Sequence, residues 1–208
     1  MWCGLASLRV EVFCWLVVAG KVSTVDVLRR KGLTLENIND RCSLCGREDE
    51  TINHLFLHCD FAAFIWKHFL KVCGISWCLP SSLVDIVEGW RLGPFSGCGL
   101  LMWKCIPFAI LWSIWKERND RIFKGSQTAV EDTVPLVTLR LSKWLLCKIE
   151  FSNLKLDDIA QDWKVYMMSG PSKGKVIVSW SPPPIGSLKF NVDGATRGKP
   201  GRHWRSSL

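Results

Sequence analysis

Three cysteines and two histidines are concentrated in one short stretch of the chain, CSLCGREDETINHLFLHC, which runs from Cys42 to Cys59. The first two cysteines have C-x2-C spacing, which lets two sulfurs reach one tetrahedral metal ion. Gly46 follows where the backbone must turn sharply. This stretch constrains the fold more than any other, because a metal ion shared by its two ends fixes where the surrounding segments meet.

The second half of the stretch offers three candidate ligands, of which only two are needed. His54 with His58 would give a two-cysteine, two-histidine site, but fingers of that type usually place ~12 residues between the pairs. Here the spacer holds eight. His54 with Cys59 would add a third thiolate and leave no coordination position open for water, which is typical of a structural site. We predict a structural Zn2+ site with the ligands Cys42, Cys45, His54 and Cys59.

The rest of the chain predicts a mainly α fold: a small helical domain stapled by this zinc knuckle. Of the 208 residues 48% are hydrophobic, which is enough for a sizeable core. Apolar residues recur at helical spacing and the segments end at glycines. The predicted helices span about residues 9–20, 25–32, 61–74, 82–90, 100–123 and 128–151.

An apolar run from Cys98 to Trp115 approaches the ~20 residues that a membrane span needs. Lys104 and Pro107 interrupt it, and its aromatic and branched residues suit a buried helix. We therefore expect no membrane association.

The formal net charge is +8, which favours polyanionic partners such as RNA, DNA or an RNA:DNA hybrid. A solvated basic surface without a partner is the alternative. The candidate phosphate contacts lie around the cysteine stretch and on the later long helix: Arg29, Arg30, Lys31, Arg41, Arg47, Lys116, Arg118, Arg121 and Lys124.

Taken together, these segments resemble the zinc-binding domain that follows the polymerase in reverse transcriptases of plant LINE-type (non-LTR) retroelements. The later WSIWKERNDRIF resembles the Trp-Lys-x-Arg-Asn helix of that family, so the resemblance extends to about Phe123. It implies that the fourth zinc ligand is the cysteine. The matching residues are Thr24, Asp26, Leu28, Arg30, Glu50, Thr51, His54, Cys59, Ile65 and Trp66.

The C-terminal SWSPPPIGSLKFNVDGATRGKPG resembles the entry to an RNase H type domain, in which Asp193 would be the first catalytic carboxylate. Such a site uses two metal ions held by several carboxylates. The residues after Asp193 are not acidic, so we expect neither a complete RNase H site nor bound Mg2+. A lone strand has no partner to pair with, so we expect this short C-terminal β-strand to be disordered.

The predicted organisation is a zinc-binding domain (1–75), a Trp-rich helical continuation (76–125), a helical connector (126–167), a Pro/Gly/Ser linker (168–187) and a truncated RNase H start (188–208). Two functions fit it. The first is a non-catalytic, nucleic-acid-binding fragment of a retrotransposon polyprotein, and the second is a scaffold that packs against the upstream reverse transcriptase segment. Scattered cysteines in apolar surroundings favour a reducing, intracellular location, nucleus or cytoplasm, over secretion.

Overall fold

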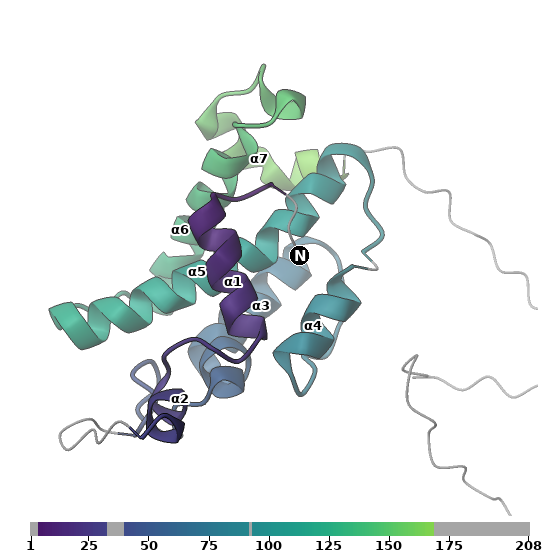
Figure 1. Cartoon of the computed structure of the whole chain (residues 1–208). Coiled ribbons are helices and arrows are strands. Elements are labelled where there is room, and N and C mark those ends of the chain that lie inside the picture. The colour runs from purple at the N-terminus through teal and green to yellow at the C-terminus, as the bar shows by residue number, and fades with distance from the viewer. Residues whose placement is uncertain (1–3, 33–39, 92, 169–208) are drawn as a thin grey trace, which may run out of the picture. The chain divides into compact units, whose positions relative to one another are not determined.

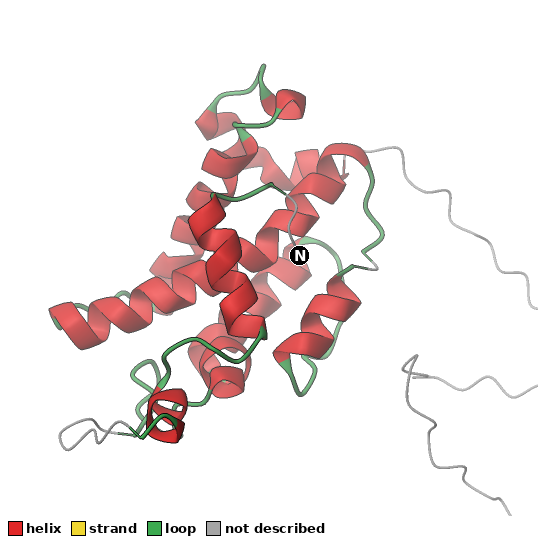
Figure 2. Ribbon diagram, in the orientation of Figure 1, coloured by secondary structure: helices red, strands yellow, loops and turns green. Residues whose placement is uncertain are grey.

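The computed structural model describes residues 4–32, 40–91 and 93–168, and no β-strand occurs among them (Figures 1 and 2). The prediction of a mainly α domain is confirmed. All described residues belong to one compact unit, Met1–Gly174. Residues 169–208, which include the predicted RNase H start with Asp193 and all of the predicted linker except its first residue, lie outside the described residues. The helices are α1 (Leu8–Val18), α2 (Val25–Arg30), the π turn η1 (His54–His58), α3 (Asp60–Val72), α4 (Leu83–Trp90), α5 (Gly97–Lys124), α6 (Val130–Leu145), the 3₁₀ turn η2 (Ile149–Phe151) and α7 (Leu156–Met168).

The long helix α5 is the centre of the domain. It packs against α1, α3, α6, α7 and η1. By length and composition α5 is the one helix in the described part of the chain that could cross a membrane, but 61% of its apolar stretch is buried inside the domain. That degree of burial fits the buried core helix predicted from the sequence.

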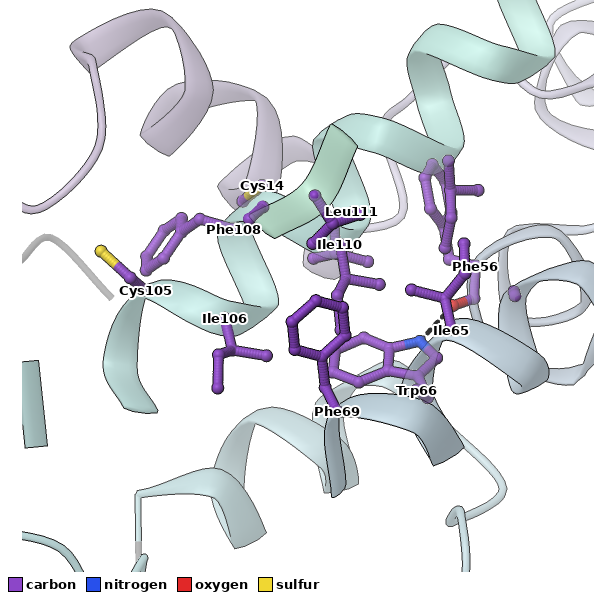
Figure 3. Packing of buried hydrophobic residues seen from close by; sticks show 14 of the residues in the cluster. Cys14, Phe56, Ile65, Trp66, Phe69, Cys105, Ile106, Phe108, Ile110 and Leu111 are labelled. Atoms are coloured by element: carbon purple, nitrogen blue, oxygen red, sulfur yellow. Dashed lines mark hydrogen bonds between the residues drawn. The ribbon is translucent and has the colours of Figure 1, made fainter. Parts of the chain in front are cut away.

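The core is formed where α3 and η1 meet α5. Phe56, Trp66 and Ile110 are fully buried there, and Figure 3 shows them with their neighbours. The indole nitrogen of Trp66 donates a hydrogen bond of 2.8 Å to the carbonyl of Phe56. This bond satisfies a buried polar pair that would otherwise cost stability, and it ties α3 to the turn that carries the histidines. The segments predicted as 1–75, 76–125 and 126–167 all contribute to this core.

Local sequence explains several helix ends. Ser82 begins α4 by accepting a hydrogen bond of 3.2 Å from the backbone N–H of Asp85, as an N-cap residue does. Helix α3 ends at Val72, and Gly74, two residues beyond it, has a φ of +67° in the left-handed region that glycine adopts easily. Both boundaries lie within two residues of the predicted ones.

The helix predicted over residues 128–151 is too long. Helix α6 ends at Leu145, and the chain then turns so that Phe151 is fully buried while Ile149 is 85% exposed. If α6 continued without a break, Ile149, four residues after the buried Leu145, would face the core in place of Phe151. Helix α7 follows and buries Ile159, Trp163 and Met167, whose spacing of four residues is the helical signal.

Candidate metal centre

The C-x2-C half of the site is a tight turn closed by backbone hydrogen bonds. An isolated antiparallel bridge joins Arg41 to Asp49, and the N–H of Cys42 donates to the carbonyl of Glu48 at 2.7 Å. The N–H of Gly46 donates to the carbonyl of Cys42 at 2.7 Å, with Gly46 at a φ of +67°. The turn therefore brings the side chains of Cys42 and Cys45 to one side, as predicted from the spacing.

The other half is the π turn η1. Its defining hydrogen bond runs from the N–H of Cys59 to the carbonyl of His54, at 2.7 Å. A π turn is closed by bonds between residues five apart, so it brings Cys59 within one turn of His54. The exposed His58 instead places its Nε2 3.1 Å from the carbonyl oxygen of Pro80.

The four side chains meet at one point. Cys42 Sγ lies 3.9 Å from Cys59 Sγ, and Cys45 Sγ lies 3.3 Å from His54 Nε2. All four ligand atoms lie within 4.8 Å of one another. A tetrahedral zinc ion with Zn–S of ~2.3 Å and Zn–N of ~2.0 Å separates its ligand sulfurs by about 3.8 Å and a sulfur from a nitrogen by about 3.5 Å. The donor set and its spacing therefore fit zinc, and the sulfurs are too far apart for a disulfide.

The paired sulfurs already favour a thiolate without metal. The Cys59 thiol can donate a hydrogen bond to the Cys42 thiolate, and this contact lowers the pKa of Cys42 to about 5. The same contact, followed by burial, raises the pKa of Cys59. A divalent cation would replace the shared proton, since metal ligation requires deprotonated sulfur.

A carboxylate lies beside the imidazole of His54. Nε2 faces Cys45, while Nδ1 lies 3.0 Å from Oε2 of Glu48. The two atoms are within salt-bridge distance, but they form an ion pair only when the imidazole is protonated, and Nδ1 has no hydrogen bond of good geometry. A carboxylate on the second nitrogen of a metal-bound histidine is the usual arrangement that leaves the first nitrogen free for the metal.

A buried ion pair anchors the site to α5. The side chains of Glu50 and Arg118 are 1% and 6% exposed, and Arg118 Nη2 lies 2.7 Å from Glu50 Oε1. A second contact joins Arg118 Nε to Glu50 Oε2 at 3.3 Å. Glu50 Oε1 also accepts from the N–H of Val25, the first residue of α2, at 3.2 Å. One carboxylate thus joins α2, the metal loop and α5.

Arg121 holds the C-x2-C turn directly. Its Nη1 donates to the carbonyl of Leu44 at 2.8 Å, and its Nε lies 2.7 Å from Glu117 Oε1. Arg118 and Arg121 were both candidate phosphate contacts in the sequence, and in the structure both guanidinium groups have partners inside the domain. The sequence signal for the role of Arg118 was the Trp-Lys-x-Arg-Asn segment. Its arginine is Arg118, which pairs with Glu50, four residues before His54.

The other predicted basic residues lie nearer the surface. Lys31 is exposed and Lys116 is half-buried. The remaining five form ion pairs with nearby carboxylates: Arg29 with Asp40, Arg30 with Asp26, Arg41 with Asp49, Arg47 with Asp60, and Lys124 with Asp120. Ion pairs between exposed side chains contribute little to stability, so these contacts hold the cations only weakly.

Fold and site together define a small helical domain built around a four-ligand knuckle of three cysteines and one histidine. Residues 1–66 match the family model described as zinc-binding in reverse transcriptase. The resemblance seen in the sequence is confirmed for this part of the chain, which is similar to reverse transcriptase zinc-binding domains.

A curated relative extends the similarity beyond this domain. The chain is 28% identical over 195 residues, or 93% of its length, to an Arabidopsis thaliana protein named "Putative ribonuclease H protein". The chain spans 28% of the length of that relative. No solved structure matches the chain.

Proposed function

We propose that this chain is a zinc-stapled, nucleic-acid-binding part of a retrotransposon reverse transcriptase polyprotein of the plant LINE type, and that it is not catalytic by itself. The observation that carries the proposal is the convergence of Cys42, Cys45, His54 and Cys59 within 4.8 Å, inside the stretch 1–66 that matches the family model. We assign these four residues as the ligands of a structural Zn2+.

The chemistry of the ligand set supports a structural role. Catalytic zinc needs an open coordination position for water or substrate, whereas four protein ligands close the shell. Two of the three sulfurs are fully buried, so water has little access to the ion. The bound ion would join the C-x2-C turn to the π turn, and binding free energy of this kind is folding free energy.

Several features support nucleic acid as the partner. The net charge of +8 attracts polyanions, and the exposed cations beside the knuckle are in weak ion pairs. The relative is named for ribonuclease H, an activity that acts on RNA. We propose RNA, DNA or RNA:DNA hybrid as the partner, in the nucleus or cytoplasm, with Mg2+ confined to a complete RNase H domain.

The test is a titration of the zinc-loaded chain with labelled RNA and RNA:DNA hybrid at rising salt. The proposal expects affinity that falls linearly with salt on logarithmic axes, because phosphate contacts release counterions. A chain that holds stoichiometric zinc and shows no such binding at low salt would rule out the nucleic-acid role.

A scaffold function has its own supporting observation. Helix α1 carries three exposed apolar side chains, Leu8, Val12 and Trp15, which are 70%, 37% and 42% exposed. Their spacing places them on one face of the helix, and an exposed apolar face is typical of an interaction site. On this alternative α1 packs against the upstream reverse transcriptase segment. A chain that aggregates alone, is rescued by that segment and has no affinity for nucleic acid would favour it.

A further inference from the structure

A groove with a volume of 350 Å³ lies at the C-terminal end of α3 and along the loop that follows it, lined by residues between Lys67 and Trp77. This volume falls in the range of roughly 300–1,000 Å³ for small-molecule sites. The groove uses none of the four metal ligands and none of the basic residues singled out from the sequence. It therefore needs a separate explanation.

Two lysines give the groove a positive rim. Lys67 and Lys71 are exposed and four residues apart, so they stand on the same face of α3. Neither forms an ion pair with any carboxylate in the described part of the chain. Burial, and then the charge of Lys71, lowers the pKa of the neighbouring His68. Like charges at this spacing repel each other unless an anion lies between them.

Two backbone carbonyls at the C-terminal end of α3, which would otherwise repel an anion, accept hydrogen bonds. The N–H groups of Ile75 and Gly74 donate to the carbonyls of Leu70 and Lys71 at 2.9 and 3.0 Å. This pair of bonds is the Schellman arrangement, which satisfies carbonyls that would otherwise face the groove. A methyl group added at Gly74 would meet no atom within 4 Å, so the space beside it is open.

Trp77 also lines the groove, and its indole packs against α4. A Cβ atom on Gly89 would lie 2.6 Å from Cζ2 of Trp77, so the indole rests directly on the backbone of α4. The ring centroid of Trp90 lies 5.9 Å from that of Trp77. Because the indole is half-buried and fixed by these contacts, it offers a rigid aromatic surface to the groove.

We propose that this groove binds one unpaired nucleotide of single-stranded RNA or DNA, with its base on Trp77 and its flanking phosphates on Lys67 and Lys71. Aromatic rings beside cations form the stacking platforms of single-strand-binding proteins. A base inside a duplex is already stacked on its neighbours, so the groove selects single strands over duplex. The inference rests on the proposed nucleic-acid function and adds its site and strand preference.

The experiment measures fluorescence anisotropy of short labelled oligonucleotides, as single-stranded RNA, single-stranded DNA and RNA:DNA duplex of one sequence. The zinc-loaded full chain is compared with Lys67→Ala/Lys71→Ala and with Trp77→Leu. Trp77→Phe keeps an aromatic ring and checks for a folding defect. Lys104→Ala/Lys143→Ala removes the same charge from two exposed lysines elsewhere and is the matched control.

The proposal expects Lys67→Ala/Lys71→Ala to lower the salt slope for single strands by about 1.4, from two lost phosphate contacts. Trp77→Leu should weaken single-strand binding by roughly five- to a hundredfold, while Trp77→Phe and the control pair keep most of it. Equal affinities for single-stranded RNA and single-stranded DNA would mean that the groove does not recognise the 2′-hydroxyl. A higher affinity for one of them would identify the natural ligand.

Two results would overturn the inference in different ways. If the unmodified chain binds nucleic acid but the groove variants behave like the control pair, the groove is not the site and the proposed function stands. Equal binding of duplex and single strands, with Trp77→Leu unaffected, removes the stacking role. If the unmodified chain binds no nucleic acid at all, the proposed function itself fails.

Discussion

The indole rings of Trp90 and Trp103 stack with centroids 4.0 Å apart and planes 8° apart, and each donates its N–H to the other's backbone carbonyl, at 2.8 and 2.7 Å. One of these two hydrogen bonds compensates for Pro107, which lies inside α5. Proline has no N–H, so the carbonyl of Trp103, four residues earlier, lacks its helical donor. Trp90 supplies that donor from α4, which explains how the long helix tolerates a central proline.

The first prediction concerns this exchange. Trp90→Phe should destabilise the domain by about 1–3 kcal/mol, because the buried carbonyl of Trp103 loses its donor. In a Pro107→Ala background residue 107 regains an N–H that can take over, so the cost of Trp90→Phe should shrink by about 1 kcal/mol. Urea unfolding of the four proteins of this double-mutant cycle measures the difference. Equal costs in both backgrounds would show that the proline and the tryptophan are not coupled.

The second prediction separates the candidate ligands. Cys59→Ser should lose stoichiometric zinc, whereas His58→Ala should keep it, because His58 faces Pro80 rather than the cysteine cluster. Metal content of the purified proteins, before and after dialysis against a chelator, is the measurement. Zinc retained in Cys59→Ser but lost in His58→Ala would overturn the ligand assignment.

The third prediction concerns the orientation of His54. Glu48→Gln removes the charge that lies 3.0 Å from Nδ1 and should weaken zinc binding by roughly tenfold, the lower end of the effect of such partners because Glu48 is exposed. Competition with a zinc indicator measures the affinity. Glu88→Gln removes an exposed carboxylate from α4 and serves as the control. Equal affinities for the two variants would mean that Glu48 does not orient the histidine.

The fourth prediction tests the anchor between the metal loop and α5. Arg118→Met leaves the carboxylate of Glu50 buried without its partner and should destabilise the domain by about 3–5 kcal/mol. The salt dependence of nucleic-acid binding by the folded protein should stay unchanged, because Arg118 is not at the surface. A lower salt slope with unchanged stability would restore the phosphate contact predicted from the sequence. Thermal unfolding and anisotropy titration supply the two readouts.

Much of the fold could be predicted because its signals are local. The helical spacing of apolar residues and Gly74 as a stop predicted α3, α4 and the body of α5. The end of α6 could not be predicted, since apolar residues continue at helical spacing through Leu146 and Ile149. The burial of Phe151 in the core, a contact between distant segments, ends that helix.

The sequence by itself determined which chemical groups the site offers, thiolates and imidazoles at spacings suited to zinc, because ligand type and short-range spacing are given by eighteen consecutive residues. Only the tertiary structure decided what the arginines do. Glu50 and Arg118 are separated by 68 residues, and no local pattern distinguishes a guanidinium that faces solvent from one that reaches a buried carboxylate. That distinction depends on how α5 packs against the metal loop, which the whole core sets.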